Sequence, residues 1–280
     1  MIKLIEKVLS KSFKQMASMS VWSPFLLVAL SKFFWMVILF YSVQWPLKII
    51  AGPLIARFFS PAALHYPGHL FWMDRILSST GVFFDVLVGA LATLFLIKII
   101  FRRSNIVEND APKKDSRMFF IFLVLSFLAQ VILSLVSKGA VFGVGLLAGK
   151  IGIKSAVINM GLLIGTNLLI SAIIYALISY IFPAIYELKS FVRGIKLGAK
   201  MGASLFFLTF LILLFALACF LPFILVKLPG AKVFLVSSYG PEALLAIDVV
   251  SWLWAVVVNT AINVIVINIY IEERGKYEAR

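Results

Sequence analysis

Three charged side chains lie inside long apolar stretches of this sequence: Lys32, Asp85 and Asp248. A charge is costly in hydrocarbon, so each should pair with another group or face a water-filled path. Such residues line routes for ions, protons or lipid head groups, and they also form structural ion pairs. We expect Lys32 to pair with one of the two aspartates, or to extend its ammonium group towards an interface. The spacing leaves these alternatives open.

The stretch around Asp248 carries further polar residues that recur at helical spacing. Spacings of three, four or eleven residues place side chains on one side of a helix, and such a side should face other helices rather than lipid. The predicted intramembrane polar seam consists of Lys32, Asp85, Asp248, Ser251, Asn259 and Asn263.

Two other groups of residues resemble a metal site and a phosphate-binding loop, but they lack the spacing or residue types that those sites require. His65 and His69 are separated by Tyr-Pro-Gly, so they do not share a helical face, and we expect no metal site. The run GLLAGK at 145–150 has three residues between its glycines where a phosphate-binding loop needs four, and Ile151 replaces the required Ser or Thr. Known hydrolase and metalloprotease motifs are absent from the sequence, and we expect no catalytic residue and no cofactor.

The amino-acid composition indicates which kind of secondary structure holds these side chains. The chain is 62% hydrophobic and 14% charged, with a mean hydropathy of +1.07. Several apolar runs are long enough to span a bilayer, which predicts an all-α polytopic membrane protein. The net charge of +14 does not indicate nucleic acid, because the basic residues gather at helix ends. The single cysteine, Cys219, excludes a disulfide within the chain.

We expect an amphipathic interfacial helix within residues 1–20 and a six-helix transmembrane bundle over 21–280. On the first helix, Ile5, Val8, Leu9, Phe13 and Met16 share an apolar side, which is typical of a helix on a membrane surface. Four prolines in 45–78 predict an interfacial or re-entrant outer segment, and the glycines after residue 136 predict an outer turn. The expected spans are about 24–44, 79–100, 118–136, 153–185, 201–226 and 241–271.

Small residues at four- or eight-residue intervals predict close helix contacts, within the chain or between chains. The predicted helix-packing glycines are Gly81, Gly89, Gly161, Gly165, Gly194, Gly198 and Gly202. The expected partners are therefore the lipid bilayer and other membrane subunits or a second copy of the chain. We expect no nucleic acid partner.

The distribution of the 26 Lys and Arg residues predicts the topology. With the N-terminus inside, basic residues in the inner segments outnumber those in the outer loops by about two to one. This favours the inner membrane of a cell, with both termini in the cytoplasm.

The end of the last span, NIYIEERGKYEAR, and the run FVRGIKLGAKMGASLFFLTFLIL before the fifth span resemble a loose set of bacterial six-helix membrane proteins. This set includes the membrane domain fused to some glycerophosphodiester phosphodiesterases. The resemblance covers mainly the chain from Phe191 onwards, implies no catalytic residue, and does not include a phosphodiesterase domain.

These observations favour a non-catalytic membrane protein that organises the membrane, handles lipid or anchors a complex. The first alternative is a permease or transporter subunit with a polar path between the first, second and sixth spans. The second is a membrane-embedded enzyme acting on lipid, which would use Asp85 or Asp248 with His65 or His69.

Overall fold

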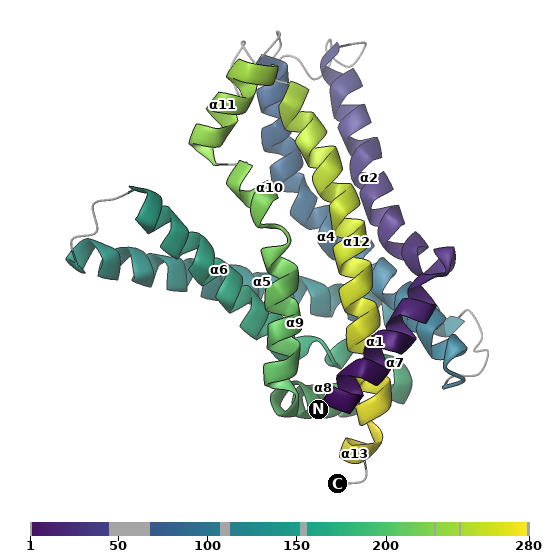
Figure 1. The fold of residues 1–280 in the computed structure, drawn as a ribbon. Helices are drawn as coiled ribbons and strands as arrows, with labels where there is room; N and C mark the ends of the chain where they lie inside the picture. The colour runs from purple at the N-terminus through teal and green to yellow at the C-terminus, as the bar shows by residue number, and fades with distance from the viewer. Residues whose placement is uncertain are drawn as a thin grey trace. The chain divides into compact units, whose positions relative to one another are not determined.

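The computed structural model describes residues 2–44, 68–106, 113–151, 156–226, 228–240 and 242–278, and within these residues it contains helices and no strands (Figure 1). The helices are α1 (Ile2–Met16), α2 (Met19–Gln44), α4 (Gly68–Arg103), α5 (Lys113–Ile151), α6 (Ala156–Ile178), α7 (Ile181–Leu188), α8 (Phe191–Ser204), α9 (Phe206–Ala218), α10 (Leu221–Val226), α11 (Pro229–Tyr239), α12 (Glu242–Glu273) and α13 (Gly275–Glu278).

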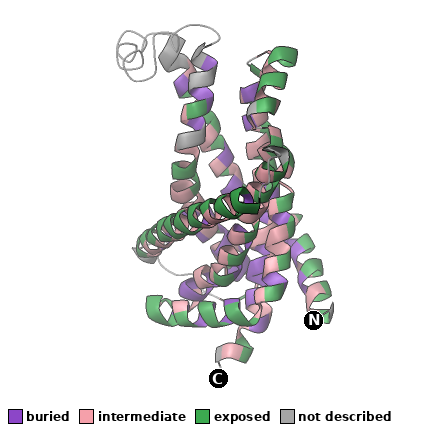
Figure 2. Ribbon diagram, turned by 90° about the vertical axis from the view of Figure 1, so that its left-hand side faces the viewer, coloured by how far each residue is buried: buried purple, intermediate pink, exposed green. Residues whose placement is uncertain are grey.

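Five of these helices are long and apolar enough to cross a membrane, and a sixth crossing is possible if the bent pair α8 and α9 forms one span. In Figure 2, the long helices carry exposed residues along much of their length. Many of these exposed residues are large and apolar, which suits contact with lipid. The predicted fold class is confirmed: the chain is an all-α polytopic membrane protein.

The chain forms two compact units. Unit 1 contains Met1–Val21, Thr93–Cys219 and Thr260–Arg280, and unit 2 contains Trp22–Ala92 and Phe220–Asn259. The boundaries fall inside α2, α4 and α12 and between α9 and α10, so each of these three long helices contributes residues to both units.

Unit 2 is held together where α2 packs against the first half of α4. The buried side chains of Leu39, Leu70, Met73 and Leu77 form its core, and Trp35 packs against them. The indole of Trp35 donates a 2.9 Å hydrogen bond to the hydroxyl of Thr80, which in turn donates to the carbonyl of Ile76. Near the start of α4, buried Asp74 pairs with Lys232 of α11 at 2.6 Å.

Unit 1 is centred on the close packing of α7 against α8, with α6 and α9 beside them. Tyr180 is fully buried between α6 and α7, and its hydroxyl lies 2.6 Å from that of Thr209 in α9. Near the middle of α6, Asn167 accepts a short hydrogen bond from Ser137 of α5. Interhelical polar contacts of this kind hold helices together where no hydrophobic force acts between them.

Three of the differences between the expected and the observed elements concern where a helix breaks, and proline accounts for two of them. The stretch 153–185 is broken after α6, because Pro183 in the first turn of α7 has no N–H to donate to the carbonyl of Ser179, and its ring would clash with that carbonyl in a continuous helix. The stretch 201–226 contains the end of α8, all of α9 and α10, and the break before α10 lies next to Pro222. At its other break, α8 and α9 meet at 83°.

The third difference concerns the glycines after residue 136, which were expected to form an outer turn. Gly139, Gly143, Gly145 and Gly149 lie inside α5, which runs 39 residues, and Gly152 lies outside the described residues. A glycine weakens a helix by about 1 kcal/mol, whereas leaving its backbone groups without partners in an apolar medium costs more. Of the expected interfacial segment 45–78, residues 68–78 form the start of α4, and residues 45–67, including His65, lie outside the described residues, as does the side chain of His69.

Candidate functional site

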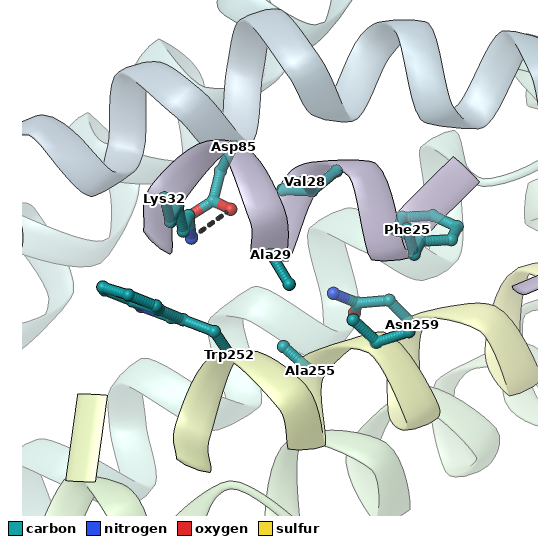
Figure 3. A pocket seen from close by; sticks show the side chains of 9 residues that line it. Phe25, Val28, Ala29, Lys32, Asp85, Trp252, Ala255 and Asn259 are labelled. Atoms are coloured by element: carbon teal, nitrogen blue, oxygen red, sulfur yellow. Dashed lines mark hydrogen bonds and ion pairs between the residues drawn. The ribbon is translucent and has the colours of Figure 1, made fainter. Parts of the chain in front are cut away.

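Within unit 2, Lys32 of α2 and Asp85 of α4 form an ion pair, with 2.6 Å between the ammonium nitrogen and one carboxylate oxygen (Figure 3). The Lys32 side chain is 12% exposed, whereas that of Asp85 is 58% exposed. Lys32 therefore has its charge satisfied mainly by Asp85, and the carboxylate remains accessible from outside. Of the two aspartates that the sequence offered as partners, this structure pairs Lys32 with Asp85.

A cavity of about 20 Å³ adjoins the pair, between α2, α4 and α12. Figure 3 shows Trp252, Ala255 and Asn259 of α12 facing Val28 and Ala29 of α2 across it. A volume of this size admits about one water molecule and no larger molecule. The arrangement can hold a hydrated ion pair at the meeting point of three helices.

The rest of the predicted polar seam does not gather in this cavity. Asp248 is buried but is not among the cavity-lining residues, and Ser251 donates its hydroxyl to the backbone carbonyl of Asp248 in its own helix at 2.8 Å. Asn263 belongs to unit 1. The cavity thus joins Lys32, Asp85 and Asn259 only, and a functional role for the remaining seam residues stays a prediction.

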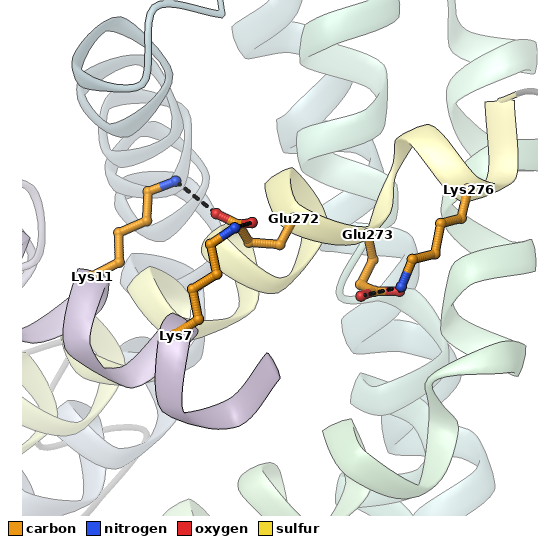
Figure 4. A network of polar contacts seen from close by, with 5 residues as sticks. All are labelled: Lys7, Lys11, Glu272, Glu273 and Lys276. Atoms are coloured by element: carbon orange, nitrogen blue, oxygen red, sulfur yellow. Dashed lines mark hydrogen bonds and ion pairs between the residues drawn. The ribbon is translucent and has the colours of Figure 1, made fainter. Parts of the chain in front are cut away.

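A second polar cluster, in unit 1, surrounds the end of α12. Glu272 accepts hydrogen bonds from Lys7 at 2.5 Å and from Lys11 at 3.3 Å, both on α1, and Glu273 pairs with Lys276 at 2.7 Å (Figure 4). The Glu272 side chain is largely shielded, whereas Lys7 is exposed, so salt can still screen the Lys7 pair from the lysine side. These pairs tie α1 to α12.

The same helix end also makes buried hydrogen bonds. The amide nitrogen of Asn268, which is fully buried, donates to Ser12 at 3.0 Å and to Gln15 at 2.7 Å, both on α1. One turn of α12 therefore binds α1 through uncharged groups, and the next turn binds it through charges.

On another side, the end of α12 contacts α7. The hydroxyl of Tyr270 donates to Glu187 at 2.5 Å, and Arg274 forms an ion pair with the same carboxylate. The ring of Tyr270 stacks on Phe101 of α4, which also meets Tyr186 edge-on. The end of α12 is thus a hub that joins α1, α4 and α7.

The sequence analysis did not select any residue of this hub as a site. Asn268 is nine positions after Asn259, which turns it to the opposite side of the helix from the predicted seam. The signal that could have found it is a cluster of one amide, one tyrosine and three charged groups at the end of an apolar helix. In the sequence alone, this cluster indicates only the end of the last membrane span.

The predicted helix-packing glycines fall into two groups. Added Cβ atoms at Gly194 and Gly198 would lie 2.5 Å from atoms of Ile185 and Ile181 in α7, and one at Gly202 would collide with the backbone of Leu177. These three glycines let α8 pack directly on the backbone of the preceding helices. A Cβ at Gly81, Gly89, Gly161 or Gly165 would meet no atom within 4 Å, so close packing at these positions stays a prediction.

Within the part of the chain that the structure describes, no three His, Cys, Asp or Glu side chains are grouped closely enough to hold a metal ion. Comparison with known proteins adds no assignment: no protein family, no curated protein and no solved structure matches this chain.

Proposed function

We propose that this protein is a non-catalytic component of the inner membrane that anchors a partner assembly at the cytoplasmic membrane surface, where both of its termini lie. The observation that carries this proposal is the attachment of α1 to the end of α12 through Asn268 and Glu272. A surface helix that only bound lipid would not need such a specific connection to a span.

The side chains that this attachment leaves outside support the proposal. Phe13 is 66% exposed and Leu9 is 36% exposed, and both lie beside the face of α1 that contacts α12. Exposed lysines, including Lys14, lie on a third side. An interfacial helix next to a span needs these three sides, for protein, lipid and head groups. The helix therefore presents a fixed surface at the membrane boundary.

The experiment compares the full chain with a variant lacking residues 2–16, each purified in gentle detergent with mass spectrometry of all co-purifying proteins and lipids. We expect a stoichiometric protein partner with the full chain and its loss from the truncated variant. A control variant, Lys3→Gln, keeps the attachment to α12 and should retain the partner. Recovery of the same partner after truncation would contradict the proposal.

The permease alternative is favoured by one observation: the Lys32–Asp85 cavity lies between α2, α4 and α12, which correspond to the first, second and sixth expected spans. The exposed Asp85 carboxylate gives this cavity a polar opening. Co-purification of an ATPase, together with loss of its activity in Asp85→Asn but not in Ser31→Ala, would establish this alternative in place of the anchoring function. Similarity to six-helix membrane domains remains a proposal and assigns no activity.

A further inference from the structure

Helix α8 has one side that is buried against α7 and the end of α6. The residues on this side are small or apolar, and three of them are the glycines that bring the backbones together. Because the contact involves backbone atoms, α8 has little freedom to roll or slide on its neighbours. Its buried residues are Gly194, Leu197, Gly198, Met201 and Gly202.

The opposite side of α8 carries a basic stripe, formed by Arg193, Lys196 and Lys200, all of which are exposed. They are three and four residues apart, so they lie along one face of the helix over about 10 Å. No carboxylate among the described residues pairs with any of the three. By contrast, Lys7 and Lys11 of α1 share Glu272. Within the described chain, the basic stripe is therefore a positively charged surface without a carboxylate partner.

Apolar side chains lie next to the basic stripe. Val192 is 74% exposed and Phe191 is 44% exposed, at the first turn of α8. Around the helix axis, Val192 lies between the basic stripe and Ile195, which is half-buried. Helix α8 thus has a protein-facing side, an apolar side and a basic side, in the same order around its axis as α1.

The bend between α8 and α9 sets the direction of these sides. The two helices meet at 83°, and α9 is apolar apart from Thr209, whose hydroxyl forms a hydrogen bond with that of Tyr180. If α9 enters the hydrocarbon, α8 lies across its end, along the membrane surface. A basic and apolar helix in this position places its ammonium and guanidinium groups among lipid head groups and its apolar side chains at the acyl boundary.

We propose that the basic stripe of α8 binds the phosphate groups of anionic phospholipids in the same membrane leaflet. This inference rests on the proposed function in one respect, the cytoplasmic side of the membrane, where anionic lipids attract basic residues near spans. Lys and Arg bind such phosphates through charge-assisted hydrogen bonds. The adjoining Val192 and Phe191 distinguish a lipid from a free phosphate ion, because only a lipid offers an apolar region beside the phosphate.

The experiment measures lipid binding to the full-length protein by native mass spectrometry in mild detergent, with phosphatidylglycerol or phosphatidylcholine as the added lipid. We expect preferential binding of phosphatidylglycerol. The variant Lys196→Gln/Lys200→Gln should bind it about 25-fold more weakly, since each basic residue near an anionic surface contributes about fivefold. The variant Lys196→Arg/Lys200→Arg should keep the affinity.

The matched control is Lys138→Gln/Lys150→Gln, which removes two exposed lysines from α5 and should leave phosphatidylglycerol binding unchanged. Equal binding by the α8 glutamine variant and this control would overturn the inference. So would loss of a co-purifying acidic protein from the α8 variant without a change in lipid binding. The partner analysis of the α1 truncation is independent: its failure would reject the anchoring function, and failure of the lipid titration would reject only the lipid site.

Discussion

Helices α1 and α8 are both short, basic and amphipathic, and both belong to unit 1, yet they are held in different ways. Helix α1 is attached by side chains: Asn268 and Glu272 of α12 reach four of its polar residues. Helix α8 is attached by backbone contact at three glycines. The strength of an attachment through polar side chains changes with salt concentration and with single polar or charged substitutions. The strength of an attachment through backbone contact changes mainly when a substitution adds side-chain volume at the contact.

The difference also determines which charges remain available. Attachment of α1 uses Lys7 and Lys11, so part of its positive charge is neutralised within the chain. Attachment of α8 uses no charge, and Arg193, Lys196 and Lys200 stay open to an anionic ligand. Glycine packing therefore lets a basic helix be held firmly without using its basic residues.

The largest effect should come from adding volume at the backbone contact of α8. In Gly198→Leu the new Cβ would lie 2.5 Å from the Cα of Ile181, and no flexible side chain can yield there. Overpacking typically costs about 1–3 kcal/mol and here should reach or exceed the upper value, because backbone must move. The measurement is the thermal unfolding midpoint of the purified protein in detergent.

The control for this substitution is Gly161→Leu in α6, where an added Cβ would meet no atom within 4 Å. It should change the midpoint little. Equal destabilisation by the two substitutions would show that general loss of helix flexibility, rather than close packing of α8, explains the effect.

The attachment of α1 should weaken by an intermediate amount in Asn268→Leu. This change removes the donor to Ser12 and Gln15 and leaves their buried oxygen atoms without it, at a cost of about 1–3 kcal/mol. Hydrogen exchange should show faster exchange of the α1 amides, while the α8 amides keep their protection.

Two serines of α1 provide a matched pair for this prediction. Ser12 is fully buried and accepts from Asn268, whereas Ser10 is exposed. Ser12→Ala should therefore increase α1 exchange more than Ser10→Ala does. The same exchange rate in both variants would argue against the hydrogen-bonded attachment.

The smallest increase in amide exchange of α1 is expected when its ion pairs with Glu272 are removed. Glu272→Gln removes the acceptor carboxylate of Lys7 and Lys11, but the Lys7 side chain is 66% exposed, and such pairs contribute about 1 kcal/mol or less. Raising the salt concentration should reproduce the effect in the unmodified protein, because salt screens exposed pairs. The comparison with α8 predicts that salt changes exchange in α1 but not in α8. Salt-sensitive exchange in α8 would contradict it.

The sequence was sufficient to predict the helical membrane class, because apolar runs of spanning length leave few alternatives. It also predicted that Lys32 pairs with one of two aspartates or extends its ammonium group towards an interface, and the structure shows the pair. The sequence did not distinguish Asp85 from Asp248, since that choice depends on which faces of α2, α4 and α12 meet. Periodicity within one helix does not contain this information.

Two parts of the structure show that the spacing of residues along one helix does not predict which residues contact another helix. Gly161 and Gly165 have the same spacing as Gly194 and Gly198, yet only the second pair meets a backbone within the chain, because contact depends on the neighbouring helix. The sequence pattern does not point to Asn268, because it predicts a single polar side for the last helix. Its final turns are in fact surrounded on several sides, with Asn268 and Tyr270 both fully buried.

The length of α5 has a mechanical consequence for the bilayer. Its apolar stretch Ser116–Ile151 contains 36 residues, or about 54 Å of helix, compared with a hydrocarbon thickness of about 30 Å. Only 6% of an 18-residue apolar window in this stretch is buried within the described chain, so most of it is left to lipid or to another protein. The helix can match this excess length by inclining, by thickening the bilayer locally, or by extending beyond the interface, where Lys138 and Lys150 would meet water. Each of these arrangements changes the lipids around α5, so the excess length of this helix makes the protein sensitive to bilayer thickness.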